Sequence, residues 1–98
     1  MNDPEMYRAH LNTVFRVQCE TDSVGIQLVD VDAGRQDKGI QQFSLFFHGP
    51  AERALPQGTY EIQHDALGSL AILIVPIVGS NHERIVYQAC FTRPTPPE

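Results

Sequence analysis

The stretch VGIQLVDVD, residues 24–32, decides the fold, because its apolar residues change face partway along. From Val24 to Leu28 every second residue is apolar, which is the pattern of a half-buried strand. The apolar set then moves by one position, to Val29 and Val31. A change of face inside one strand is what a β-bulge produces, because its extra residue offsets the alternation. We therefore predict a bulge near Leu28–Val29.

The same alternation indicates five further strands, separated by glycine-containing or proline-containing turns. Gly68, which ends a four-residue connection, is expected to supply a positive φ. Six strands joined mostly by short turns leave no room for crossover helices. The fold class is therefore predicted to be all-β, a six-stranded antiparallel sheet that forms either a small barrel or a two-layer sandwich. The five further segments are TVFRVQCE (13–20), FSLFFHGP (43–50), GTYEIQH (58–64), SLAILIVPIVG (69–79) and ERIVYQACFTR (83–93).

The chain divides into one β domain and two short ends. Asp3-Pro4-Glu5 is typical of a helix start, so residues 1–11 are predicted to form a short helix or an arm. Residues 12–93 form the single domain, and residues 94–98 (PTPPE) a disordered, solvated tail. The polar segment 33–39 is expected to be a mobile loop, and residues 79–82 a turn.

Composition excludes several classes of partner. The chain has 98 residues, of which 42% are hydrophobic and 19% charged, which fits a globular domain. The net charge is −5 and the seven Lys and Arg residues are scattered singly, so neither nucleic acid nor an anionic membrane surface is an expected partner.

The N-terminus lacks the features of a secretory signal, and the longest apolar run is about half of the roughly 20 residues that a spanning helix needs. We expect a cytoplasmic protein.

The histidines and cysteines give no chemical motif. His64 is followed by Asp65, but adjacent residues on a strand point to opposite faces, so the pair is a poor chelator. The imidazole is expected to be at the surface or bonded within a turn. Ser44 and His48 share a face but lie roughly 13 Å apart at strand rise. We therefore expect no catalytic residue, no metal and no cofactor, and a protein that is not an enzyme.

Cys19 and Cys90 lie far apart in the sequence and belong to no zinc-binding spacing. Small apolar cysteines are usually buried, and cytosolic thiols stay reduced. Both are therefore expected to be buried and free rather than joined in a disulfide.

The most informative feature is an excess of apolar residues. Phe46 faces away from Phe43 and Phe47, and residues 70–75 are apolar on both faces. An antiparallel sheet usually keeps one face wet, so the second face should be covered by the N-terminal segment, by a second sheet layer or by another chain.

Three functions are compatible with that excess. The first is a non-enzymatic accessory or assembly domain that contacts a partner protein, or another copy of itself, through an apolar sheet face or edge. The alternative is a barrel that binds a small apolar ligand. The third, an enzyme, requires at least two of four side chains to converge in one cleft. Those four are His48, His64, Asp65 and Glu61, and the candidate interaction or ligand-lining residues are Phe46, His48, Tyr60 and Tyr87.

A series of motifs resembles a known family of uncharacterised bacterial domains of about a hundred residues. The motifs are F-S-L-x-F-x-G-P (43–50), L-P-Q-G-x-Y (55–60), H-x-x-L-G (64–68), V-P (75–76) and Y-x-A-x-F-x-R (87–93). The resemblance covers residues 12–93 and implies a neighbourhood of genes for proteins of the phage tail-collar, microcystin-dependent type. It implies no catalytic residues.

Overall fold

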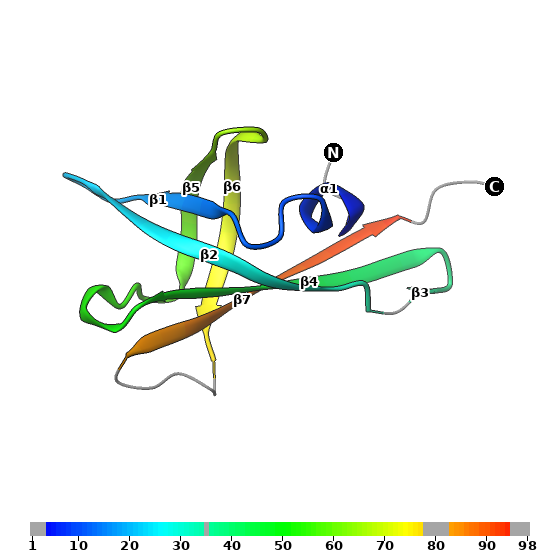
Figure 1. The fold of residues 1–98 in the computed structure, drawn as a ribbon. Helices are drawn as coiled ribbons and strands as arrows, with labels where there is room; N and C mark the ends of the chain where they lie inside the picture. Colours follow the sequence, from blue (N-terminus) through cyan, green and yellow to red (C-terminus); the bar gives the residue numbers. More distant parts are fainter. Residues whose placement is uncertain (1–3, 35, 78–82, 95–98) are drawn as a thin grey trace.

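The computed structural model describes residues 4–34, 36–77 and 83–94, in which strands predominate (Figure 1). The chain begins with a short helix and continues as a series of strands, of which β3 is only two residues long. A single 3-10 turn, η1, connects β4 to β5. The elements are α1 (Pro4–Arg8), β1 (Val14–Gln18), β2 (Ser23–Asp32), β3 (Gln36–Asp37), β4 (Ile40–Pro50), η1 (Ala51–Arg53), β5 (Gly58–His64), β6 (Gly68–Pro76) and β7 (Arg84–Pro94).

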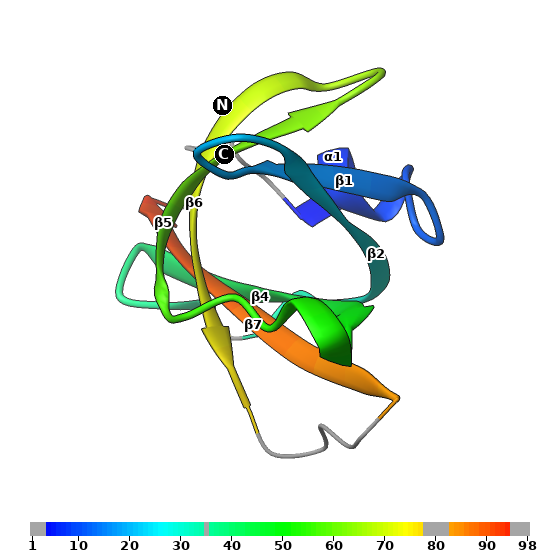
Figure 2. The ribbon, with the colours of Figure 1, turned by 90° about the vertical axis from the view of Figure 1, so that its left-hand side faces the viewer.

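Six of these strands form a closed barrel. The ladder runs in the order β2-β1-β5-β6-β7-β4, and β4 pairs again with β2, so the sheet returns to its starting strand. Every pairing is antiparallel. Figure 2 shows β5 and β6 on one side of this ring and β2 on the other. The predicted fold class is confirmed, and of the two predicted architectures the chain forms the barrel.

The bulge in β2 makes this closure geometrically feasible. Residues 23–27 of β2 pair with β1, and residues 27–32 pair with β4. The register shifts between Leu28, opposite Phe47, and Asp30, opposite Phe46, so Val29 has no opposing residue. The extra residue keeps Leu28 and Val31 both buried, although they are an odd number of positions apart. The predicted bulge is confirmed.

The ladders around the barrel differ greatly in length. β4 and β7 pair from Ile40↔Pro94 to Pro50↔Arg84, and β5 and β6 pair along their whole length. In contrast, within the described residues β1 pairs with β5 only at residues 16–17, and β6 pairs with β7 only at residues 75–76, next to a hydrogen bond from the Ile77 N–H to the Val86 carbonyl. The β5–β6 hairpin is therefore attached to the rest of the barrel through two short ladders.

Aromatic and aliphatic side chains fill the barrel. Phe15 and Phe47 meet edge to face, with ring centroids 5.4 Å apart. At one end α1 packs on β2 and β4, and Tyr7 stacks on Phe91 at 5.7 Å and lies tilted against Phe43 at 6.2 Å. The N-terminal segment thus covers one end of the inner face, on which Phe43 lies, and not the second face for which coverage was predicted. The buried apolar set is Tyr7, Phe15, Val17, Val24, Ile26, Leu28, Val31, Phe43, Leu45, Phe47, Leu55, Ile62, Ile72, Ile74, Tyr87 and Ala89.

Segment 33–39 differs from its prediction as an unstructured mobile loop. It contains β3, which forms a small hairpin with β4 through Lys38 (φ 52°) and Gly39 (φ 80°). The predicted positive φ of Gly68 is confirmed at 80°. At the C-terminal end Pro94, the last residue of β7, pairs with Ile40 of β4. The strand therefore extends one residue into the predicted tail. The rest of the tail, the predicted turn at 79–82 and the predicted helix cap at Asp3 lie outside the described residues.

Gly49 gives a direct test of the packing inside the barrel. It follows Phe43, Leu45 and Phe47 on the inward face of β4, and a Cβ there would lie 2.9 Å from both Ile26 Cγ2 and Tyr87 Cε2. We expect Gly49→Ala to lower the free energy of unfolding by about 1–3 kcal/mol, because the core must shift to admit the methyl group. Urea denaturation measures the change.

Gly58→Ala is the matched control, because its Cβ would meet the Tyr60 ring at an ordinary 3.6 Å. Its effect should stay within about 1 kcal/mol. Equal losses in the two variants would contradict the packing described here.

Candidate functional site

Phe46, the first of the predicted interaction residues, lies on the outer face of β4. It stands between Asp30 of β2 and Gln88 of β7 in the two neighbouring ladders. Its ring is half-buried, whereas the flanking Leu45 and Phe47 are fully buried inside the barrel. The predicted opposition of Phe46 to Phe43 and Phe47 is therefore confirmed.

His48 follows Phe46 on the same outer face. It pairs across the ladders with Gln27 of β2 and Val86 of β7. Partial burial, together with the nearby Arg84 guanidinium, lowers the pKa of His48 below its ordinary value. The lowered pKa favours the neutral form of this side chain.

Three barrel strands carry an exposed large apolar side chain among the described residues: Val14 of β1 at 52%, Ile40 of β4 at 48% and a leucine of β6. Ile72 and Ile74 point inward and are buried, but Ala71 and Leu73, which alternate with them along the strand, point outward. Leu73 is 49% exposed, and its cross-strand neighbour is the exposed Thr59 of β5. The described part of the chain thus leaves this second face of β6 open, and contact with another chain stays a prediction.

One edge of β6 is also unpaired along most of its length. Residues 68–74 pair with β5 on one side, while the ladder with β7 on the other side is confined to Val75 and Pro76 among the described residues. The unpaired segment reads GSLAILI and contains no charged residue and no proline. We call this segment, with the outward Ala71 and Leu73, the β6 surface.

Tyr60 and Tyr87, the predicted ligand-lining residues, hold the connection between η1 and β5. The Tyr87 side chain is fully buried, and its hydroxyl accepts the Leu55 N–H at 2.8 Å. Burial raises the pKa of Tyr87 above its ordinary value. The Tyr60 hydroxyl donates to the Pro56 carbonyl at 2.7 Å in a more exposed position. Each hydroxyl therefore has a structural partner.

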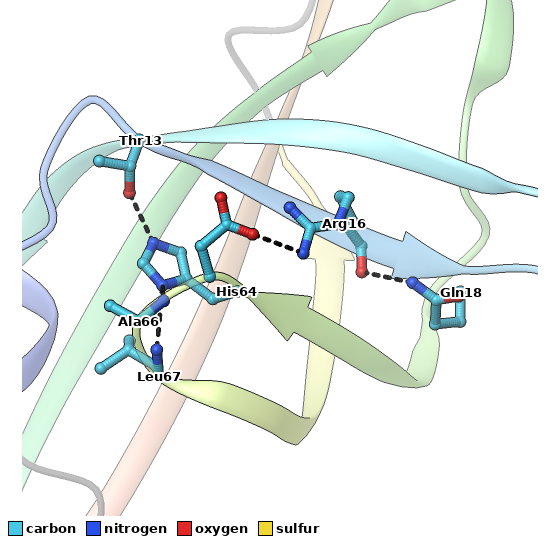
Figure 3. Close-up of polar contacts among 7 residues, drawn as sticks. Thr13, Arg16, Gln18, His64, Ala66 and Leu67 are labelled. Atoms are coloured by element: carbon cyan, nitrogen blue, oxygen red, sulfur yellow. Dashed lines mark hydrogen bonds and ion pairs between the residues drawn. The ribbon is translucent and has the colours of Figure 1, made fainter.

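The sequence did not single out the contacts of His64, which lies inside one end of the barrel (Figure 3). Its side chain is only 6% exposed. Nδ1 accepts the N–H groups of Ala66 at 3.0 Å and Leu67 at 3.2 Å, so the proton of the neutral ring is on Nε2. Nε2–H then donates to Thr13 Oγ1 at 2.9 Å. The Thr13 hydroxyl in turn donates to the His10 carbonyl at 2.6 Å.

The surroundings of His64 oppose a positive charge. The ring lies against Phe15 and His10, at centroid distances of 4.4 and 4.8 Å. Burial lowers the pKa of His64, the nearby His10 and Arg16 lower it further, and the Asp65 carboxylate acts in the opposite direction. Bonding within a turn was predicted for this residue, but its deep burial and its bond to Thr13 were not, because 51 positions separate the two residues.

Three of the four side chains of the enzyme hypothesis, those of His64, Asp65 and Glu61, have separate hydrogen-bond or ion-pair partners. The carboxylate of Asp65 pairs with Arg16 at 2.9 Å, and that of Glu61 accepts the Gln63 amide at 3.3 Å. His48 is on the outer face of β4, whereas His64 is inside the barrel. No group of three or more His, Cys, Asp or Glu side chains in the described segments is placed to hold a metal ion.

Two further sequence expectations concern the cysteines and membranes. Both cysteines are free, but the expected burial is wrong, because Cys19 is half-buried and Cys90 exposed. Cys90 lies on the outer face of β7, where its Sγ is 3.6 Å from Ser44 Oγ. Among residues 4–34, 36–77 and 83–94, no helix has the length and apolar character that crossing a membrane requires.

The two tyrosines give a prediction with an internal control. Tyr87→Phe removes the acceptor of a buried N–H, so we expect a loss of about 1–3 kcal/mol in the free energy of unfolding. Tyr60→Phe removes a more exposed hydrogen bond and should change the same quantity by less than about 1 kcal/mol. Chemical denaturation of both variants measures the difference. Equal small losses would show that the Leu55–Tyr87 bond does not hold this connection.

A comparison with protein families agrees with the resemblance noted in the motifs. The family model described as a domain of unknown function, DUF6916, matches residues 3–91. No curated protein and no solved structure matches the chain. The match extends over most of the chain, including α1, five of the six barrel strands and β7 as far as residue 91. The chain therefore belongs to the DUF6916 family of uncharacterised domains.

Proposed function

We propose that this domain is a non-enzymatic accessory or assembly module that contacts a partner protein through the β6 surface. The observation that carries the proposal is the 49% exposure of Leu73 on a strand that is apolar on both faces. Exposed aliphatic side chains on an uncharged strand are unfavourable in water and become favourable when another protein covers them.

The unpaired edge supports the same proposal. Proteins usually protect exposed strand edges with lysine, proline, bulges or very short strands. Residues 68–74 contain no lysine and no proline, and no bulge interrupts their ladder with β5. An edge of this kind suits a partner that adds an extended strand, because main-chain groups then form the hydrogen bonds and alternate side chains fill the apolar sites.

The resemblance of the motifs gives this proposal its biological setting. It implies a bacterial protein encoded beside proteins of the tail-collar, microcystin-dependent type, and these are the partners we propose, in the cytoplasm. Self-association through the same surface is the other arrangement that the uncharged edge allows, because like charges would not oppose one another across it. The net charge of −5 argues against nucleic acid and anionic membranes as partners.

The ligand-binding alternative has less support from the contacts. Of the residues proposed to line a ligand site, namely Phe46, Tyr60 and Tyr87, the two tyrosines use their hydroxyls in the connection before β5: Tyr87 bonds residue 55 and Tyr60 bonds residue 56. The third, Phe46, lies outside the barrel rather than in its interior.

Leu73→Lys tests the proposed surface, with Thr59→Lys as its matched control. Both positions are exposed and lie opposite each other in the β5–β6 ladder, so both variants place a lysine on the same face. Light scattering first gives the oligomeric state of the wild-type protein. Isothermal titration calorimetry with the purified tail-collar-type protein that a neighbouring gene encodes then gives the affinity. We expect Leu73→Lys to weaken binding, or self-association, by about tenfold or more. Thr59→Lys should stay within about threefold.

Unfolding curves of both variants check that the barrel is intact. A wild-type protein that is monomeric and binds no neighbour-encoded protein would contradict the proposed function. Equal affinities for the wild-type protein and Leu73→Lys would contradict the assignment to β6.

A further inference from the structure

We propose that His64 is a pH-sensitive latch: the neutral ring holds the N-terminal arm (residues 4–13) on the barrel, and protonation of the ring releases it. The observation that carries this proposal is the pattern of hydrogen bonds around one buried imidazole. The latch is independent of the interaction proposed for the β6 surface.

Only the neutral ring fits its site. Nδ1 faces two N–H donors, those of Ala66 and Leu67 (Figure 3). A proton on Nδ1 would convert the acceptor into a third donor, so both hydrogen bonds would be lost and two N–H groups left without their acceptor. The ring can accept the proton only if it leaves this position or if the turn at residues 65–67 rearranges.

The other nitrogen of the ring connects this turn to the arm. Nε2–H donates to Thr13 Oγ1, and Thr13 is the last residue before β1. The same hydroxyl donates to the His10 carbonyl, so the ring fixes the turn that follows α1. Beyond this link, Asn12 N–H donates to the Leu28 carbonyl at 2.7 Å, and Tyr7 stacks on Phe91. Movement of the ring therefore breaks the bond that joins the arm to the β5–β6 turn.

Each element packed against the ring places a charged or titratable group near it. His10 comes from the arm, Asp65 from the β5–β6 turn and Arg16 from β1, while Phe15 of β1 contributes an apolar face. The Asp65 carboxylate, which favours a cation, is itself paired with the Arg16 guanidinium at 2.9 Å.

The direction of the pH effect follows from the lowered pKa of His64 in the closed form. When the arm is open, the exposed ring has an ordinary pKa of about 6.5. The open form therefore binds more protons below that pH, and the closed form is fully favoured only above it. As the pH falls from about 6.5 towards the lower pKa of the closed form, the opening constant should rise by up to about tenfold per pH unit for each proton bound. Below the closed-form pKa the rise ends.

Nuclear magnetic resonance on the full chain between pH 8 and pH 5 tests the latch. The imidazole nitrogen shifts of His64 report its tautomer and its protonation, and hydrogen exchange of the Asn12 amide, corrected for intrinsic exchange, reports the opening of the arm. We expect the Nε2–H tautomer at pH 8. We also expect Asn12 protection to fall over the pH range in which His64 titrates. The Nδ1–H tautomer at pH 8, or titration of His64 without a change at Asn12, would overturn the proposal.

His64→Asn separates the latch from a purely structural role, because its amide oxygen can accept the two turn N–H groups but does not titrate. We expect its arm opening to be nearly independent of pH between 7 and 5. The matched variant His10→Asn should keep most of the wild-type pH dependence. Thr13→Val, which removes the link itself, should open the arm already at pH 8. An unchanged pH profile in His64→Asn or in Thr13→Val would overturn the latch, even if one of the other variants failed to fold.

Discussion

The barrel depends on one strand that belongs to two ladders. β2 pairs with β1 through its first half and with β4 through its second half, and the change takes place at the bulged residue Val29. Without the extra residue, either Leu28 or Val31 would point into water, because neighbouring faces alternate along a strand. The bulge keeps both inside while the strand bends, and the sheet can then close through the two short ladders at either side of the β5–β6 hairpin.

Local pattern was enough to predict the six barrel strands, the bulge and the turn at Gly68, because alternation and turn-forming residues can be recognised from neighbouring positions; it did not predict the two-residue β3. The long ladder between β4 and β7 was not predictable in the same way, since its partners lie about 34 to 54 positions apart. The contacts of His64 show the same limit. Its bonds to Ala66 and Leu67 are local and agree with the predicted turn, whereas its bond to Thr13 exists only after the barrel has closed.

The polar side chains inside the domain serve to hold connections. Tyr87 fixes residue 55, Tyr60 fixes residue 56, and His64 joins the β5–β6 turn to the N-terminal arm. The fold thus places the candidate residues predicted from the sequence at two separate sites. Tyr60 and Tyr87 hold a connection, while Phe46 and His48 share the outer face on β4. Leu73 is an exposed apolar residue beside the unpaired edge of β6, and the sequence indicated it only as part of a strand that is apolar on both faces.

Backbone cross-strand nuclear Overhauser effects between β2 and β4 test the central claim most directly, because they report which residues face each other. Closure through the bulge predicts contacts of Leu28 with Phe47 and of Asp30 with Phe46, with Val29 facing neither. A continuous register in which Val29 stands opposite Phe46 would contradict the account, since β2 could not then keep its apolar residues inside on both sides of that point.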